Sequence, residues 1–133
     1  MKVSKTTARI LFLLYMAALL FLCFGKFSDM PSTPPRLLGI DGDKIVHFLM
    51  FLPFPVLSYF AFPLPTRKPW QSILLACLIL AAGAVFAAGT EFVQDFLPYR
   101  EADKADFMAD FIALCLSTLA VLAIDLHKTL RHA

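Results

Sequence analysis

Four long apolar runs, separated by loops rich in proline and glycine, constrain the fold of this chain more than any other feature. A helix needs about 20 mostly apolar residues, with a range of roughly 17 to 25, to cross the hydrocarbon core of a bilayer. The segments that qualify lie at about residues 10–24, 45–62, 72–96 and 107–124. The sequence therefore predicts an all-α integral membrane bundle of four transmembrane helices, in a single domain that covers residues 1–133.

The composition agrees with a membrane setting and excludes several classes of protein. Hydrophobic residues make up 59% of the chain and charged residues only 17%, so a soluble domain of this size would expose too much apolar surface. The net charge is only +2 and the basic residues are dispersed between the apolar runs, so the expected partner is the lipid bilayer and not nucleic acid. The three cysteines lie singly in different apolar runs without a CxxC pair, and we interpret them as small buried residues.

The first apolar run has two interpretations, because Lys2, Lys5 and Arg9 precede it as basic residues precede a signal peptide. No small-x-small cleavage pattern follows the run, and Leu22 before Cys23 is too bulky for a lipoprotein processing site. We therefore expect a retained anchor helix.

The basic residues that flank the spans predict the orientation of the chain. Lysine and arginine stand without acidic neighbours at the N-terminus and in the second loop, whereas several basic residues of the first and third loops stand beside acids. Basic flanks favour the cytoplasmic side, so we expect both termini in the cytoplasm of a multi-pass protein and the first and third loops outside. Trp70, close to Arg67 and Lys68, suits an interfacial anchor on the cytoplasmic side.

Small residues and prolines inside the runs predict how the helices pack. Pro53 and Pro55 should bend the second helix and free backbone carbonyls. Gly83, Ala87 and Gly89 would let a neighbouring helix approach the third one closely.

Acidic and amide residues interrupt the predicted outer ends of the apolar runs, where their burial needs a physical reason. A charge at the centre of a spanning helix costs roughly 2.5 to 3.5 kcal/mol, and such residues usually face a bundle interior, a partner or a watery cavity. Spacings of three and four residues place them on shared helix faces. The short third turn makes the third and fourth helices antiparallel neighbours. The expected outward-facing polar cluster contains Asp43, Lys44, His47, Glu91, Gln94, Arg100, Asp103, Asp106 and Asp110.

These residues fall into two sequence elements, DKIVHF at 43–48 and EFVQDFLPYREADKADFMAD at 91–110. Together the elements resemble the VanZ-like family of small bacterial integral membrane proteins, whose pattern joins D-K-x-x-H to E-x-x-Q-x-F-x-P-x-R-x-x-D-x-x-D-x-x-x-N. The resemblance covers both elements with their order and spacing. The chain departs from the pattern at Asp110, where the family usually has Asn, and at Ala113, where it usually has Gly.

The resemblance implies a multi-pass protein of the bacterial cytoplasmic membrane, connected with glycopeptide resistance of the teicoplanin type or with another cell-envelope process. It implies a site more firmly than a reaction. The motif positions that it assigns in this chain are Asp43, Lys44, His47, Glu91, Gln94, Phe96, Pro98, Arg100, Asp103 and Asp106.

Two functions of the cluster involve no catalysis. In the one we favour, the cluster binds an envelope component, such as a lipid-linked phosphate or a peptide carboxylate, through Arg100, Lys44 and His47. In the other, the cluster only locks four helices together, as buried paired polar groups do. Single residues also have simpler roles, since Asp106 suits a first-turn acid of its helix.

A third function is a small intramembrane enzyme that acts on a lipid-linked phosphate. Glu91, Asp106 and Asp110 would then bind a divalent cation through oxygen ligands, with His47 as acid or base. The sequence places no serine or cysteine nucleophile beside a base, and acids four residues apart are not a specific metal motif. On the sequence alone we therefore assign no metal and no cofactor, and we favour a binding protein over an enzyme.

Overall fold

The computed structural model describes residues 3–24, 42–98 and 104–132, which form five α-helices. The helices are α1 (Lys5–Phe24), α2 (Gly42–Phe51), α3 (Phe54–Ala61), α4 (Pro69–Gln94) and α5 (Lys104–Arg131). Because α2 and α3 form one continuous span, four stretches are long and apolar enough to cross a membrane. The predicted all-α bundle with four membrane-spanning helices is confirmed, and the chain is a multi-pass membrane protein.

The helix bounds differ from the predicted ones mainly at the polar ends. The first and fourth predicted spans are both too short, because α1 begins at Lys5 and α5 runs from Lys104 to Arg131. In α5, Asp106 lies in the first turn and Lys128 in the last, which is the charge arrangement that the helix dipole favours. Charged turns thus continue the helix beyond the apolar stretch that defined the prediction.

The second span is interrupted at Pro53, as the sequence predicted. Proline cannot donate a backbone hydrogen bond, and α2 accordingly ends at Phe51 while α3 begins at Phe54. The Met50 carbonyl beside this break accepts a hydrogen bond from the Tyr15 hydroxyl on α1. A side chain of a neighbouring helix thus satisfies a backbone group at the kink, as membrane-spanning helices require.

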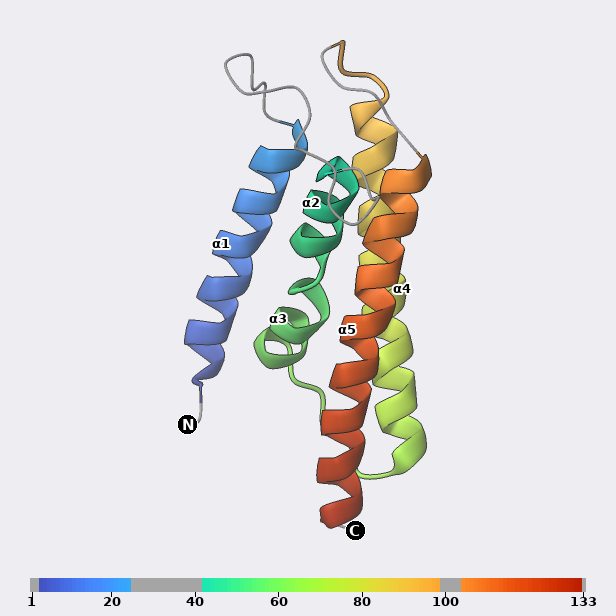
Figure 1. Ribbon diagram of the computed structural model, residues 1–133. Helices are drawn as coiled ribbons and strands as arrows, with labels where there is room; N and C mark the ends of the chain where they lie inside the picture. The colour runs from blue at the N-terminus through green and yellow to red at the C-terminus, as the bar shows by residue number, and fades with distance from the viewer. Residues whose placement is uncertain (1–2, 25–41, 99–103, 133) are drawn as a thin grey trace.

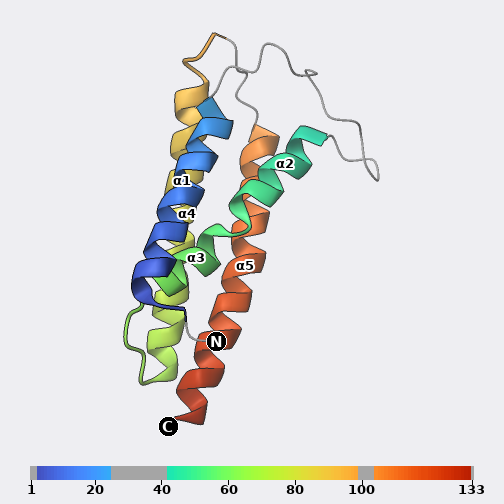
Figure 2. The ribbon, with the colours of Figure 1, turned by 90° about the vertical axis from the view of Figure 1, so that its left-hand side faces the viewer.

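The helices pack around α5, which contacts α2, α3 and α4, while α1 lies against α3 (Figures 1 and 2). The expected antiparallel neighbourhood of α4 and α5 is present. The N and C labels lie at the same end of the bundle in Figure 1, as four spans require. That this end faces the cytoplasm stays a prediction.

Close packing within the bundle involves some of the predicted small residues. A Cβ atom added at Gly83 would lie 2.7 Å from Leu114 Cδ2, so the glycine allows α5 to approach α4. Ala87 is fully buried in the same core, whereas Gly89 has open space around it and does not serve a close contact. Ala113, where the family pattern has Gly, is also fully buried.

The interpretation of all three cysteines as buried is correct for one of them. Cys23 is buried in the core, Cys115 is half-buried and Cys77 is exposed on the bundle surface. In a membrane-spanning helix an apolar side chain gains nothing from avoiding the lipid, so an apolar run does not reveal which of its residues face inward.

Candidate functional site

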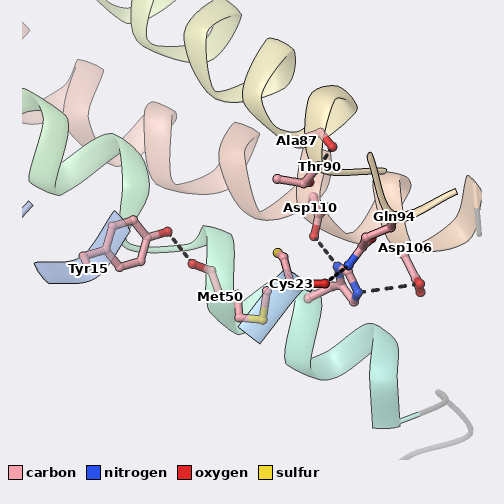
Figure 3. A network of polar contacts seen from close by, with 9 residues as sticks. Tyr15, Cys23, Met50, Ala87, Thr90, Gln94, Asp106 and Asp110 are labelled. Atoms are coloured by element: carbon pink, nitrogen blue, oxygen red, sulfur yellow. Dashed lines mark hydrogen bonds and ion pairs between the residues drawn. The ribbon is translucent and has the colours of Figure 1, made fainter. Parts of the chain in front are cut away.

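His47 on α2 lies at the centre of a cluster that α2, α4 and α5 build together. Its Nδ1 atom is 3.1 Å from Asp110 Oδ1, and its Nε2 atom is 3.6 Å from Asp106 Oδ2. Figure 3 shows the two aspartates extending from α5, with dashed lines marking both contacts. The predicted shared face of Asp106 and Asp110 therefore exists, and it is directed at the imidazole.

Glu91 joins the cluster from α4, the third helix that contributes to it. One carboxylate oxygen of Glu91, one of Asp106 and one ring nitrogen of His47 lie within 4.8 Å of one another. We define these three residues as the His47 centre. Its members come from three helices and from both motif elements, so the fold brings together what the sequence separates.

The site is largely shielded and rich in acid. Asp106 is 6% exposed and Asp110 is 0% exposed, and the His47 side chain is 12% exposed. Among the described side chains, three carboxylates therefore surround one imidazole, and Lys44 lies one turn away on α2. Buried like charges repel strongly, and a bound cation or protons would relieve that repulsion.

One distance within the centre suits a first-row divalent cation. Nitrogen and oxygen ligands lie about 2.0–2.2 Å from Zn²⁺, so two ligands of a tetrahedral ion are about 3.4 Å apart. The 3.6 Å between His47 Nε2 and Asp106 Oδ2 is close to that value. Three protein ligands leave a fourth position for water or an anionic ligand, as in catalytic zinc sites.

Asp110 lies on the other side of the imidazole from Asp106. The sequence named it as a candidate cation ligand in the enzyme alternative, and the structure places it against Nδ1, the ring nitrogen that does not face Asp106. A carboxylate on the second nitrogen of a metal-binding histidine fixes the tautomer and orients the ring. If His47 held a cation through Nε2, Asp110 would be the carboxylate that orients its ring. The second oxygen, Oδ2, is buried without a hydrogen-bond partner within the described segments.

The other predicted residues lie around the centre or outside the described part of the chain. Gln94 is buried and donates from Nε2 to the Cys23 carbonyl at 2.7 Å, so it ties α4 to the last turn of α1. Lys44 is half-buried, one turn before His47 on α2. Asp43 lies in α2, but its side chain is not described, and Arg100 and Asp103 lie outside the described residues.

A second polar cluster, which sequence reasoning missed, lies at the opposite end of α5. Asp125 accepts hydrogen bonds from the Tyr59 and Thr66 hydroxyls, each at 2.8 Å. The hydroxyl oxygens of Thr129 and Ser72 are 3.1 Å apart. The Thr129 hydroxyl also donates to the backbone carbonyl of Asp125. The sequence signal was Asp125 and Thr129, an acid and a hydroxyl residue four positions apart. Both lie just beyond residue 124, where the predicted fourth helix ended.

Comparison with known proteins gives limited information. No protein-family model matches the chain, and no solved structure matches it. It is similar to an uncharacterized protein of Schizosaccharomyces pombe, with 36% identity over 87 residues that cover 65% of this chain and 49% of that protein. The chain thus spans about half the length of this relative.

Fold and site together define a multi-pass α-helical membrane protein with a buried centre of one histidine and several carboxylates. The relative is fungal and uncharacterized, so the comparison adds no function. The VanZ-like resemblance and the bacterial membrane stay predictions.

Proposed function

We propose that the chain is a VanZ-like membrane protein whose His47 centre holds a divalent cation, and that this cation binds the phosphate of a lipid-linked cell-envelope ligand. The observation that carries the proposal is the convergence of one imidazole nitrogen and two carboxylate oxygens within 4.8 Å. A nitrogen and oxygen set of this kind suits Zn²⁺ and neighbouring first-row ions.

The arrangement around the histidine supports a metal centre over a simple helix lock. Two acids contact the two ring nitrogens of His47, and a third acid, Glu91, converges with Asp106 on one of these nitrogens. Asp110 leaves Nε2 directed at Asp106, which is the arrangement of carboxylate, histidine and metal in known sites. The proposal therefore changes the cation hypothesis formed from the sequence by giving His47 a ligand role.

A cation also explains how so acidic a site would bind an anion. The carboxylates alone would repel phosphate, but a divalent ion with an open coordination position attracts it. Lys44, one turn from His47, adds a positive charge on α2. Because the centre lies within membrane-spanning helices, a ligand anchored in lipid reaches it more readily than a soluble one. The link to glycopeptide resistance belongs to this proposal through the VanZ-like resemblance.

Cation binding is tested on the full chain in lipid nanodiscs, stripped with a chelator and titrated with Zn²⁺ and Mn²⁺. The parent should bind one cation per chain, and Glu91→Gln should weaken binding by more than about 100-fold, since loss of a direct ligand should exceed the 10- to 100-fold typical of outer partners. The matched control is Asp95→Asn, which removes an exposed acid at the end of the same helix and should bind as the parent does. Absence of cation binding by the parent, or equal loss in the control, would contradict the proposal.

The biological role is tested with a deletion strain exposed to cell-wall antibiotics. The parent gene and Asp95→Asn should restore the wild-type response, whereas Glu91→Gln should not. In vitro, a polyprenyl phosphate should bind the zinc-loaded protein and be released by chelation. Complementation by every variant would refute a functional site. Polyprenyl phosphate binding that persists after chelation of the zinc would refute the role of the cation.

A further inference from the structure

A cavity of about 650 Å³ opens at the end of the bundle opposite the His47 centre, beside the chain termini. Its lining comes from the start of α1, the end of α3, the connection to α4 and the last turns of α5. Four of the lining residues carry basic side chains, and all four are exposed: Lys5, Arg67, Lys128 and His132. The cavity is thus a concave basic surface at the end of membrane-spanning helices.

The one acidic residue in this lining is already engaged by the protein. Asp125 is 4% exposed and accepts the hydroxyl hydrogen bonds of Tyr59 and Thr66. These bonds hold the connection between α3 and α4 against α5, which places Arg67 beside the cavity. Lys128 is held on the other side, with Nζ 6.0 Å from the centroid of the Tyr59 ring. The buried Asp125 therefore positions the residues of the cavity wall, and the exposed basic side chains of Arg67 and Lys128 line the cavity.

Part of the remaining wall is apolar. Phe60 is 47% exposed and Leu64 is 54% exposed, and both line the cavity. Trp70, 58% exposed, lies in the first turn of α4 at the same end, as expected of a residue at the membrane interface. A ligand in this cavity would meet positive charge at the end of the bundle and apolar surface toward the bilayer.

We propose that this cavity binds the headgroup phosphate of an anionic phospholipid. Basic pockets between membrane-spanning helices recognise such headgroups, and each lysine or arginine near the surface strengthens binding by about fivefold. Three lysine or arginine side chains line the cavity against one acid whose oxygens are occupied by hydroxyl donors. The apolar wall selects a lipid over free phosphate. This site is independent of the cation at the His47 centre.

The test measures retention of phosphatidylglycerol and phosphatidylcholine on the full chain by native mass spectrometry and by titration in mixed micelles. The parent should prefer phosphatidylglycerol. The double variant Arg67→Gln/Lys128→Gln should lose about 25-fold in affinity, which is two charges at about fivefold each. The control Lys68→Gln/Arg131→Gln removes the same charge from exposed residues at the same end that do not line the cavity. It should retain most of the parent's preference.

Three results would overturn the proposal. Equal loss in the cavity and control variants would show general attraction to a basic surface. Equal binding of both lipids by the parent would show that the headgroup is not recognised. Displacement of the lipid by millimolar inorganic phosphate would show a site for free anions. Melting curves of both variants in phosphatidylcholine should match the parent, which establishes that a loss of binding is not a loss of folding.

Discussion

Asp110 gives the sharpest test of the His47 centre, because its proposed task is to orient a ligand and not to bind the cation. Its Oδ1 atom lies 3.1 Å from His47 Nδ1, and its side chain is fully buried. Asp110→Asn keeps an acceptor of the same shape but removes the charge. Asn is also what the VanZ-like pattern usually has at this position, so the variant replaces this chain's departure with the common residue.

The expected magnitude follows from that one hydrogen bond. Hydrogen bonds to charged groups contribute about 1.5–3 kcal/mol net and neutral ones about 0.5–1.5 kcal/mol. Replacing the first kind with the second should weaken cation binding by about 1–1.5 kcal/mol, or roughly 5- to 12-fold. Asp110→Leu removes the acceptor altogether and should weaken binding by about 10- to 100-fold, as with other outer partners of metal ligands.

The metal-free protein should respond less strongly. Asp110→Asn weakens the hydrogen bond to His47 but also removes one of the carboxylates around it, and these two effects oppose each other in the free energy of unfolding. The assay therefore has two parts, zinc titration in nanodiscs and denaturant unfolding after chelation. Asp125→Asn is the control, since it removes a buried acid from the same helix at the other end and should leave zinc affinity unchanged.

Two results would refute this reasoning. Unchanged zinc affinity in both Asp110 variants would show that the imidazole needs no orienting carboxylate. A loss of metal-free stability without any change in zinc affinity would show that Asp110 and His47 form only a structural pair.

Two further predictions concern the bundle itself. Gly83→Ala should destabilise the protein by about 1–3 kcal/mol, because the new Cβ would lie 2.7 Å from Leu114 Cδ2 in a filled core. Gly89→Ala, with nothing within 4 Å, should be neutral or stabilising, and equal denaturant midpoints for the two variants would contradict the packing argument. Tyr15→Phe should cost about 1 kcal/mol, since the Met50 carbonyl at the kink loses its donor, and an unchanged unfolding free energy would show that another group replaces it.

The features that the sequence predicted well have local causes. Apolar length alone identified the spans, and Pro53 identified the break between α2 and α3. The three- and four-residue spacings placed Asp106 and Asp110 on one face of α5, where both are buried. Because the cost of burying these acids in lipid is large, their presence in apolar runs already indicated a site.

The features that could not be predicted from the sequence depend on contacts between segments that are far apart in the chain. Which acid contacts which ring nitrogen of His47 follows from how α2 and α5 cross, and no spacing within one helix contains that information. Asp125 was overlooked because its main partner, Tyr59, lies on another helix. The hydrogen bond from Gln94 to the Cys23 carbonyl likewise joins α4 to α1, and no spacing within one helix predicts it.

The two polar clusters lie toward opposite ends of one helix, α5. Asp110 and Asp125 are about 22 Å apart along α5 at the usual rise of about 1.5 Å per residue. Between them the helix buries Ala113, Leu114 and Val121 together with the hydroxyl residues Ser117 and Thr118. The proposed cation and the proposed phospholipid therefore lie too far apart for direct contact. Their affinities should be independent as long as that helix keeps its packing against α4.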